Sequence, residues 1–392
     1  MIKTKIISLK KKNNILIVHS IGEFSGSLKS LEEYLKIMVK DYNFYFLTPS
    51  GIAEKRLKKY GHVIKTLGLS KFDNSILGYY RGLRWLILLR EILLIFPTLF
   101  SVFLIKKNIK KLDLIHFNEV TLVPTIFIFK FFFKEPFILH CRILFKKNNY
   151  FGKRICKFLK KNIFKIIAID NDVKNSFPSN LNIEVIRNIF FIKKIKKKTF
   201  FKDGYINLGY IGSYLKYKGL EDLILIHNKL NKKRKIRLYL AGNFIPEKWY
   251  GNILNLSNNI NKNLLNSKNI FNMGHLNNIQ LFYQKIDVIC FPSYLNALGR
   301  QIFEAGFYKI PSIVCLKKNS ADSFINKKTG LSFKRPGDLN KFEKIVDYFC
   351  LNKKSIIKMG KNANYLIKSN HNIKKNLAKI KRVYSECVKI KR

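Results

Sequence analysis

Acidic residues are scarce in this 392-residue sequence, which has 24 Asp and Glu against 75 Lys and Arg. The formal net charge of +51 makes a polyanionic partner, such as nucleic acid or an anionic membrane, one interpretation. The alternative is composition alone, because Lys, Asn, Ile and Phe are abundant together, as in the products of AT-rich genomes. The lysines are scattered and no nucleic-acid-binding motif accompanies them, so we favour composition and expect no nucleic-acid partner.

Cysteine is also uncommon, and no two cysteines stand at the spacing of metal ligands. The six residues are Cys141, Cys156, Cys290, Cys315, Cys350 and Cys387. Unpaired thiols in apolar strands are typical of a reducing compartment, so we expect a cytoplasmic protein. The basic N-terminus meets no long apolar segment before the short run at residues 14–18, so we expect no signal peptide.

Long apolar runs are absent apart from residues 83–105, which are apolar enough to be considered as a membrane span. This segment contains Arg84, Arg90 and Glu91, and charges near the centre of a span are unfavourable in hydrocarbon. We therefore expect a buried or an interfacial helix. The lysines at residues 106–111 would attract anionic lipid, so the interfacial alternative places the protein on the inner face of the cytoplasmic membrane without crossing it.

Short apolar runs alternate with helical stretches along most of the chain. The runs lie at residues 14–18, 44–47, 63–66, 113–117, 137–140, 166–169, 206–211, 236–241, 270–273 and 288–291. This alternation predicts βαβ units and mostly parallel sheets. The length and the 47% apolar content suit two cores. We expect an α/β protein with doubly wound domains at residues 1–190 and 191–370, followed by a C-terminal helix at 371–392.

The most informative stretch reads DVICFPSYLNALGRQIFEA, at residues 287–305. Its apolar run, closed by Pro292-Ser293, predicts a buried parallel strand, and a helix is expected from about Gly299. A helix N-terminus that faces the end of a strand is suited to bind an anion. Glu304, about one turn inside this helix, is then placed to accept hydrogen bonds from paired hydroxyls such as those of a ribose.

The same stretch resembles the donor-site signature of retaining glycosyltransferases of family 4, which have the GT-B fold of two Rossmann-like domains facing a cleft. In that family two acidic residues lie eight positions apart, and the second begins a Glu-Ala pair. Glu304-Ala305 match the second residue, whereas Asn296 occupies the first position. The resemblance implies that the donor is contacted by Asn296, Ala297, Leu298, Gly299, Arg300 and Glu304. A C-terminal helix that crosses back to the first domain is also implied.

The family's diphosphate-binding residues have partial counterparts after the apolar run at 206–211. The family has Gly-Arg at this point, followed by Lys-Gly, and both basic residues bind the donor diphosphate. Here Gly212-Ser213 lacks the arginine, while Lys218 matches the lysine. We expect Lys218 to neutralise the leaving diphosphate and Ser213 to lack one bidentate contact. Gly274 and His275 are expected to line the nucleotide base through backbone groups.

Candidate residues in the first half follow strand ends. Gly26 lies in a small-residue loop that, by the resemblance, faces the donor phosphate or the acceptor. His116 with Asn118, and His140 with Arg142, stand at the ends of two predicted strands, where open α/β sheets bind ligands. The family often has histidines or basic residues at both places, near the donor sugar and its phosphates. A single histidine is more often structural, but two such clusters favour a functional role, above all for His140 with Arg142.

The resemblance implies a retaining glycosyltransferase that moves a sugar from a nucleoside diphosphate sugar to a saccharide or lipid-linked acceptor, in cell-envelope polysaccharide or lipopolysaccharide synthesis. Catalysis would depend on His140, Lys218 and Glu304, without a metal or a bound cofactor. Two alternatives stay open. One is a sugar-nucleotide epimerase or a phosphorylase on the same fold. The other is a non-catalytic polyanion-binding protein, which Ser213 and Asn296 would favour.

Overall fold

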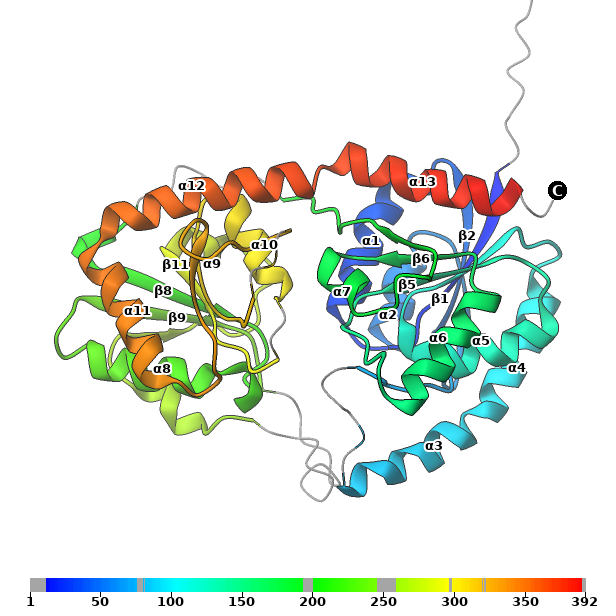
Figure 1. The fold of residues 1–392 in the computed structure, drawn as a ribbon, viewed down its shortest axis with the longest axis horizontal. Helices are drawn as coiled ribbons and strands as arrows, with labels where there is room; N and C mark the ends of the chain where they lie inside the picture. The colour runs from blue at the N-terminus through cyan, green and yellow to red at the C-terminus, as the bar shows by residue number, and fades with distance from the viewer. Residues whose placement is uncertain are drawn as a thin grey trace, which may run out of the picture. The chain divides into compact units, whose positions relative to one another are not determined.

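The computed structural model describes residues 12–75, 80, 82–192, 200–244, 259–295, 298–318, 320 and 322–389. The chain divides into two compact units (Figure 1). Unit 1 comprises Met1–Ile189 together with Ile373–Arg392, and unit 2 comprises Phe190–Asn372. The lysine-rich run at residues 193–198, expected as the linker between domains, lies outside the described residues.

Unit 1 contains a seven-stranded parallel sheet in the order β3-β2-β1-β4-β5-β6-β7. Its strands are β1 (Asn13–Val18), β2 (Tyr42–Pro49), β3 (His62–Thr66), β4 (Leu114–Phe117), β5 (Phe137–Cys141), β6 (Lys165–Ala168) and β7 (Ile183–Val185). The central strands β4 and β5 are buried along their whole length, as in parallel sheets that helices cover on both faces. The strand order reverses between β1 and β4, which creates a topological switch point at their carboxyl ends.

The helices of unit 1 come from both ends of the sequence. They are α1 (Gly26–Met38), α2 (Ile52–Leu57), α3 (Ile87–Leu93), α4 (Ile95–Asn108), α5 (Val123–Phe132), α6 (Tyr150–Asn162), α7 (Asn171–Asn175) and α13 (Ile373–Lys389), with short 3-10 turns at Gly82–Leu86 and Val120–Leu122. On α13, Val383 and Tyr384 belong to the same buried cluster as Leu114 of β4 and Ile138 of β5. The last helix is therefore part of the core of unit 1.

Unit 2 repeats the design with a six-stranded parallel sheet in the order β10-β9-β8-β11-β12-β13. The strands are β8 (Ile206–Ile211), β9 (Ile236–Ala241), β10 (Ile270–Asn272), β11 (Val288–Phe291), β12 (Ser312–Cys315) and β13 (Gly330–Phe333). The helices are α8 (Leu220–Leu230), α9 (Gln280–Lys285), α10 (Arg300–Phe307), α11 (Leu339–Leu351) and α12 (Lys353–Asn370), with 3-10 turns η3 (Lys202–Gly204), η4 (Lys216–Lys218) and η5 (Lys262–Asn266). The switch point lies between β8 and β11. The prediction of two doubly wound α/β units is confirmed.

The apolar segment at 83–105 was predicted to be either a buried or an interfacial helix, and the structure differs from the first of these. It becomes a 3-10 turn followed by α3 and α4, and by length and composition the helical stretch Ile87–Asn108 could cross a membrane. Only 28% of its apolar window is buried. The prediction of a buried core helix is therefore wrong, because one side of the helix covers β3 while the other side faces outward. The interfacial alternative stays a prediction.

Candidate functional site

In unit 2 the loops that follow β8 and β11 pack against each other at the switch point. Gly219 has φ of 72°, and a Cβ on it would lie 2.2 Å from the carbonyl oxygen of Pro292, so this position requires glycine. The backbone N–H of Tyr294 donates a hydrogen bond to the carbonyl oxygen of Tyr217, over 2.9 Å. These contacts bring the loop after β11 against η4 and thereby fix the backbone beside Lys218.

The ammonium group of Lys218 lies at the end of β11. Its Nζ is 5.8 Å from the ring centre of Phe291 and 5.5 Å from that of Tyr217. Burial against these rings lowers the pKa of Lys218, because an ammonium loses hydration there. A diphosphate beside Nζ would offset this loss of hydration. The position of Lys218 therefore fits its predicted role as the cation that binds a phosphate.

Three glycine turns lie side by side at the carboxyl ends of β8, β9 and β10. Gly212, Gly242 and Gly274 all have positive φ, at 151°, 144° and 61°. The N–H of Gly212 donates to the carbonyl oxygen of Ala241 over 2.9 Å, and that of Gly242 donates to Gly274 over 2.8 Å. A Cβ on Gly242 would lie 1.9 Å from the carbonyl oxygen of Gly212, so the turns can approach only as glycines. This edge presents backbone groups to a ligand.

Two predicted donor residues, Ser213 and His275, follow these turns. Ser213 follows Gly212, and its carbonyl oxygen accepts a hydrogen bond from Tyr210 Oη over 2.8 Å. His275 follows Gly274 and is exposed. Gly242 was not among the predicted donor residues, because its close approach to Gly212 depends on a strand pairing that is visible only in the folded sheet.

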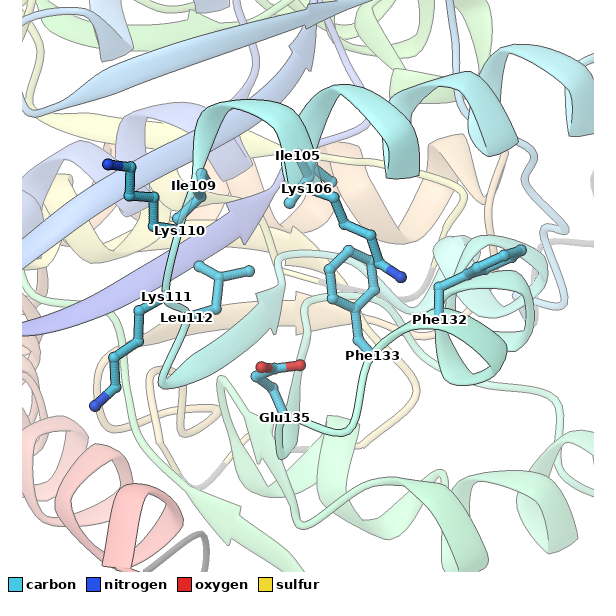
Figure 2. Close-up of a pocket in the computed structure, with 9 residues that line it drawn as sticks. All are labelled: Ile105, Lys106, Ile109, Lys110, Lys111, Leu112, Phe132, Phe133 and Glu135. Atoms are coloured by element: carbon cyan, nitrogen blue, oxygen red, sulfur yellow. The ribbon is translucent and has the colours of Figure 1, made fainter.

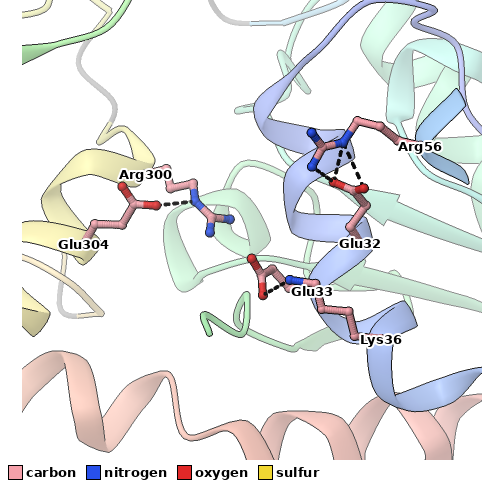
Figure 3. Close-up of polar contacts among 6 residues, drawn as sticks. All are labelled: Glu32, Glu33, Lys36, Arg56, Arg300 and Glu304. Carbon is pink, nitrogen blue, oxygen red and sulfur yellow. Dashed lines mark hydrogen bonds and ion pairs between the residues drawn. The ribbon is translucent and has the colours of Figure 1, made fainter. Parts of the chain in front are cut away.

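Glu304 on α10 is held by two side chains. Arg300 Nε donates to one carboxylate oxygen over 2.7 Å (Figure 3), and Tyr283 Oη donates to the other over 3.0 Å. The guanidinium carbon of Arg300 lies 4.6 Å from the ring centre of Phe190. A carboxylate can accept about four hydrogen bonds, so these contacts are compatible with further hydroxyl ligands. Glu304 is thus oriented before any ligand binds.

Tyr283 was missed by the sequence reasoning, because it is on α9 and no spacing links it to Glu304. Burial and the charge of Glu304 raise the pKa of Tyr283 well above its ordinary value, so its hydroxyl remains a hydrogen-bond donor. Arg300, predicted as a donor contact, pairs with Glu304 and orients its carboxylate.

The remaining predicted donor residues lie at the start of α10. Gly299 is the N-cap of this helix in an extended conformation, and Leu298 packs against the apolar cluster of unit 2. Asn296 and Ala297 lie outside the described residues. The helix begins as expected, and its N-terminus carries the positive end of the helix dipole, which favours an anion.

In unit 1 the carboxyl ends of β1, β4 and β5 are linked through Arg142. Its Nη2 donates to Asn118 Oδ1 over 3.1 Å, and its Nη1 donates to Asn188 Oδ1 over 2.9 Å. Nδ2 of Asn118 lies 3.1 Å from Nδ1 of His19, and Nη2 of Arg142 lies 3.4 Å from Nδ1 of His140. The residues predicted from the two strand ends are therefore brought together, and His19 joins them.

Three histidines of this edge are buried. The rings of His116 and His140 stack with centroids 5.5 Å apart, and Nδ1 of His116 lies 2.6 Å from the hydroxyl of Tyr384. The Nε2 atoms of His19, His116 and His140 have no hydrogen-bond partner within the described part of the chain. All three atoms are also buried, so their free hydrogen-bonding capacity is enclosed within unit 1.

Burial keeps these imidazoles neutral. It lowers the pKa of His19 to about 4 and of His116 to about 3, and places the pKa of His140 well below its usual value. The charge of Arg142 acts in the same direction on all three. His140 is consequently a neutral hydrogen-bonding group rather than a strong base near pH 7.

Gly26 is the first residue of α1, and a Cβ on it would meet nothing within 4 Å. Its neighbours therefore do not require glycine, which leaves the backbone at this helix end open to approach. The helix is fixed by the pairing of Glu32 with Arg56, whose Nη2–Oε2 distance is 2.6 Å (Figure 3). Ser27 also donates a hydrogen bond to Glu119, over 2.7 Å. Glu119 was not predicted as part of this edge.

A metal site is not evident in the part of the chain that the structure describes, where no group of three or more His, Cys, Asp or Glu side chains could hold an ion. Asp170-Asn171-Asp172 has the spacing of an Asp-x-Asp metal motif. The carboxylate of Asp170 accepts a hydrogen bond from the N–H of Val173 over 2.7 Å and caps α7. This triplet therefore has a local structural role.

Known proteins provide an independent comparison. Residues 191–379 match the family model described as Glycosyl transferases group 1. No curated protein matches the sequence significantly.

Among solved structures, Anabaena Alr3699/HepE in complex with UDP-glucose is 15% identical, with a TM-score of 0.70 over 95% of this chain and 99% of that chain. A glycosyltransferase from Rickettsia africae is 17% identical, with a TM-score of 0.70 over 96% and 99%. The lipopolysaccharide outer core galactosyltransferase WaaB is 13% identical, with a TM-score of 0.64 over 95% and 99%. At these identities the likeness shows the fold, and the predicted GT-B fold is confirmed.

Proposed function

We propose that this protein is a retaining, metal-independent glycosyltransferase of group 1 that takes a nucleoside diphosphate sugar as its donor. The acceptor is a saccharide or a lipid-linked saccharide, and the product serves cell-envelope polysaccharide or lipopolysaccharide synthesis in the cytoplasm. The family match over residues 191–379 supports the transferase class. A neighbour that binds UDP-glucose and another that is a lipopolysaccharide galactosyltransferase support the donor and the pathway.

The observation that carries the proposal is the set of groups at the switch point of unit 2. It combines the half-buried ammonium of Lys218, the oriented carboxylate of Glu304 and the backbone turns at Gly212, Gly242 and Gly274. A cation suits a diphosphate, a buried carboxylate suits the two hydroxyls of a ribose, and glycine turns leave room for a flat base. A nucleoside diphosphate has these three parts.

The reaction requires a good leaving group. The bond between the anomeric carbon of the sugar and the diphosphate oxygen breaks, and the acceptor oxygen bonds to the same face of that carbon. The proton of the acceptor hydroxyl passes to the departing diphosphate. Lys218 and the N-terminus of α10 stabilise the negative charge that develops on the diphosphate. No protein nucleophile is needed in this route.

For unit 1 we propose roles that do not involve proton transfer by a side chain. Arg142 supplies a fixed positive charge near the donor, and the buried, neutral His140 lies beside its guanidinium and helps to position it. Gly26 leaves an open helix end for a phosphate or an acceptor group. These assignments follow from the chemistry of the groups at the carboxyl ends of β1, β4 and β5.

The test is to incubate the purified protein with a panel of nucleoside diphosphate sugars, with and without saccharide acceptors. We expect nucleoside diphosphate release that depends on the acceptor, and a product whose anomeric configuration, read by NMR, matches that of the donor. Conversion of the donor sugar without an acceptor would identify an epimerase, and release that requires inorganic phosphate would identify a phosphorylase. Binding of polyanions with a steep salt dependence and no sugar chemistry would contradict the transferase proposal.

A further inference from the structure

The helical stretch Ile87–Asn108 lacks the polar outward side of an ordinary surface helix over most of its length. Three polar side chains in it, Glu91, Thr98 and Ser101, are buried against the body of unit 1. Apart from Arg90, its outward residues from Leu89 to Phe103 are Leu, Ile and Phe, and polar residues are exposed again only at its C-terminal end. A helix on the surface of a soluble domain normally shows the opposite arrangement.

Hydrogen bonds attach this stretch to the core along its buried side. Ser101 Oγ donates to Thr66 Oγ1 over 2.8 Å, and the N–H of Ser70 donates to Thr98 Oγ1 over 3.0 Å. Ser70 Oγ donates to the carbonyl oxygen of Glu91 over 2.8 Å. A membrane span would require these contacts to break and would leave their buried polar groups unpaired. One side of the helical stretch therefore stays packed against unit 1, and the other side faces outward.

The outward side forms an apolar face that continues onto α5, which packs beside α4. We call it the docking face and define it by Leu89, Ile92, Phe96, Phe100, Phe103 and Phe131. Phe96 and Phe131 are 71% and 70% exposed. Isolated exposed apolar side chains are common, but a contiguous set of this kind marks an interaction surface.

Lysines border one end of the docking face. A cavity of about 350 Å³ lies where α4 and α5 end, with Lys106, Lys110 and Lys111 among the residues that line it (Figure 2). Leu112 and Phe133, which are buried, form part of its apolar lining.

The lining of this cavity is cationic on balance. Glu135 contributes one carboxylate against the three lysines. The Nζ of Lys106 lies 5.6 Å from the ring centre of Phe132, so a positive charge and an aromatic side chain of the same surface are adjacent. Apolar residues thus meet a cationic rim, which complements a bilayer whose headgroups are anionic.

We propose that the docking face lies in the plane of an anionic lipid bilayer, with its apolar side chains among the acyl chains and with Lys106, Lys110 and Lys111 at its rim contacting lipid phosphates. Apolar burial and lysine attraction together give the two signals that stable peripheral attachment needs. The surface belongs to unit 1 alone, so the binding is separate from the sugar chemistry proposed above.

Co-sedimentation of the full chain with vesicles tests the proposal. One set of vesicles contains phosphatidylcholine alone, and the other an equal mixture of phosphatidylcholine and phosphatidylglycerol. We expect the protein to pellet with the anionic vesicles and to be released in part by high salt, because salt screens the lysines but not the apolar contacts. Recovery in the supernatant with both vesicle types would overturn the proposal.

Two variants separate the two signals. The triple substitution Phe96→Ser, Phe100→Ser and Phe103→Ser should weaken the partition into anionic vesicles by at least about 100-fold, because three exposed aromatic rings no longer enter the lipid. The substitution of Lys106, Lys110 and Lys111 by Gln should weaken it by on the order of 100-fold. All six side chains are exposed, so unchanged circular dichroism is expected for both variants.

Matched controls lie in unit 2. Leu351→Ser with Tyr365→Ser removes apolar side chains that are 61% and 79% exposed, and substitution of Lys341, Lys344 and Lys358 by Gln removes three exposed charges. Vesicle binding should persist in both controls. Equal losses of vesicle binding in the controls and in the docking-face variants would mean that net charge and nonspecific hydrophobic contacts cause the binding. That result would overturn the proposal.

Two other occupants of this face give different results. A second copy of the chain would appear as a dimer in light scattering, dissociated by the phenylalanine variant, without binding to vesicles. A true span would resist extraction from membranes by alkaline carbonate. Either result would overturn attachment in the plane of the bilayer. Transferase activity on a water-soluble acceptor should be unchanged in the docking-face variants, so failure here is distinguishable from failure of the proposed function.

Discussion

Both sheets have a topological switch point, but different kinds of residue lie at the carboxyl ends of their strands. In unit 1 the strand ends carry the buried His19 and His140 and the partly buried Arg142, and Arg142 contacts His140 directly and His19 through Asn118. In unit 2 the corresponding edge carries glycine turns and a lysine against aromatic rings. Doubly wound topology therefore determines where a ligand can bind, whereas the residues after each strand determine which chemical groups it meets.

This difference has an electrostatic consequence. The edge of unit 1 holds its histidines neutral because they are buried near Arg142. The edge of unit 2 holds Lys218, whose pKa is lowered by burial. We therefore expect acid to lower the stability of unit 1 and alkali to lower the affinity of unit 2 for its donor. These two expectations make the comparison testable.

The largest expected effect is the loss of stability of unit 1 in acid. The folded pKa values of His19 and His116, about 4 and about 3, lie below those of unfolded histidine, so the unfolded state binds more protons. Stability is fully present above about pH 6.5 and falls by ~1.4 kcal/mol per pH unit for each such histidine as the pH drops towards about 4. Hydrogen exchange measured by mass spectrometry at pH 7 and pH 5 should show faster opening in peptides of unit 1.

Unit 2 and a variant serve as controls for the acid experiment. Unit 2 also contains a buried histidine with a lowered pKa, His227, so its stability should fall less steeply and not remain constant. His140→Phe keeps an aromatic ring in the stack with His116 and removes one titrating group, so it should flatten the acid response of unit 1. Equal pH dependence of the two units would contradict the comparison.

The next largest effect is expected for Glu304→Ala. Loss of a charged hydrogen-bond acceptor should weaken binding of the nucleoside diphosphate by about 1.5–3 kcal/mol, as measured by calorimetry. The structure adds a cost in stability, because Arg300 and Tyr283 would lose a buried partner. Glu304→Gln is the matched control, since it retains one acceptor oxygen and the same shape. Wild-type donor affinity in the alanine variant would contradict the assignment of the site.

A smaller effect is expected for Lys218→Met, about 1.5 kcal/mol of donor binding, because Lys218 is only partly buried and water screens its charge. The pH dependence is more diagnostic. Donor affinity should fall as the pH rises through the lowered pKa of Lys218, at a lower pH than for an ordinary lysine. Lys218→Arg should move this fall to higher pH. Identical pH profiles for the lysine and arginine forms would show that this group does not bind the phosphates.

The smallest effect is expected for Asn296→Glu, which restores the acid of the resembling family. An amide both donates and accepts hydrogen bonds, whereas a carboxylate only accepts, so the preference among donor sugars should change by about tenfold or less. Affinity for the free nucleoside diphosphate should stay nearly constant. Competition between pairs of donor sugars measures this ratio, and an unchanged ratio would place Asn296 outside the sugar pocket.

Much of the fold could be predicted from the sequence because short apolar runs mark parallel strands directly. The run at residues 288–291 coincides with β11, and the helix expected from Gly299 begins at Arg300. Strand ends were less well predicted: β2 extends beyond its apolar run at both ends, to Tyr42 and Pro49. Pairing with β1 and β3 stabilises these extra residues, and such neighbours cannot be read from a local pattern.

The candidate site shows the same limit more clearly. Lys218 and Glu304 were identified because they stand within linear motifs. Tyr283 and Gly242 were missed because their roles arise from contacts between separate elements. The outward direction of the apolar side of α4 was also missed, since the polar residues that face the core are too few to form a visible period.

The position of α13 has a consequence for how the chain folds as it is synthesised. Tyr384 and its neighbours complete the apolar core of unit 1, and Tyr384 contacts His116 in β4. All residues of unit 2 have already been made when these last residues are still being added. Unit 2 can therefore reach its final structure on a growing chain, while unit 1, although it begins first, must wait with part of its core uncovered until the last helix arrives.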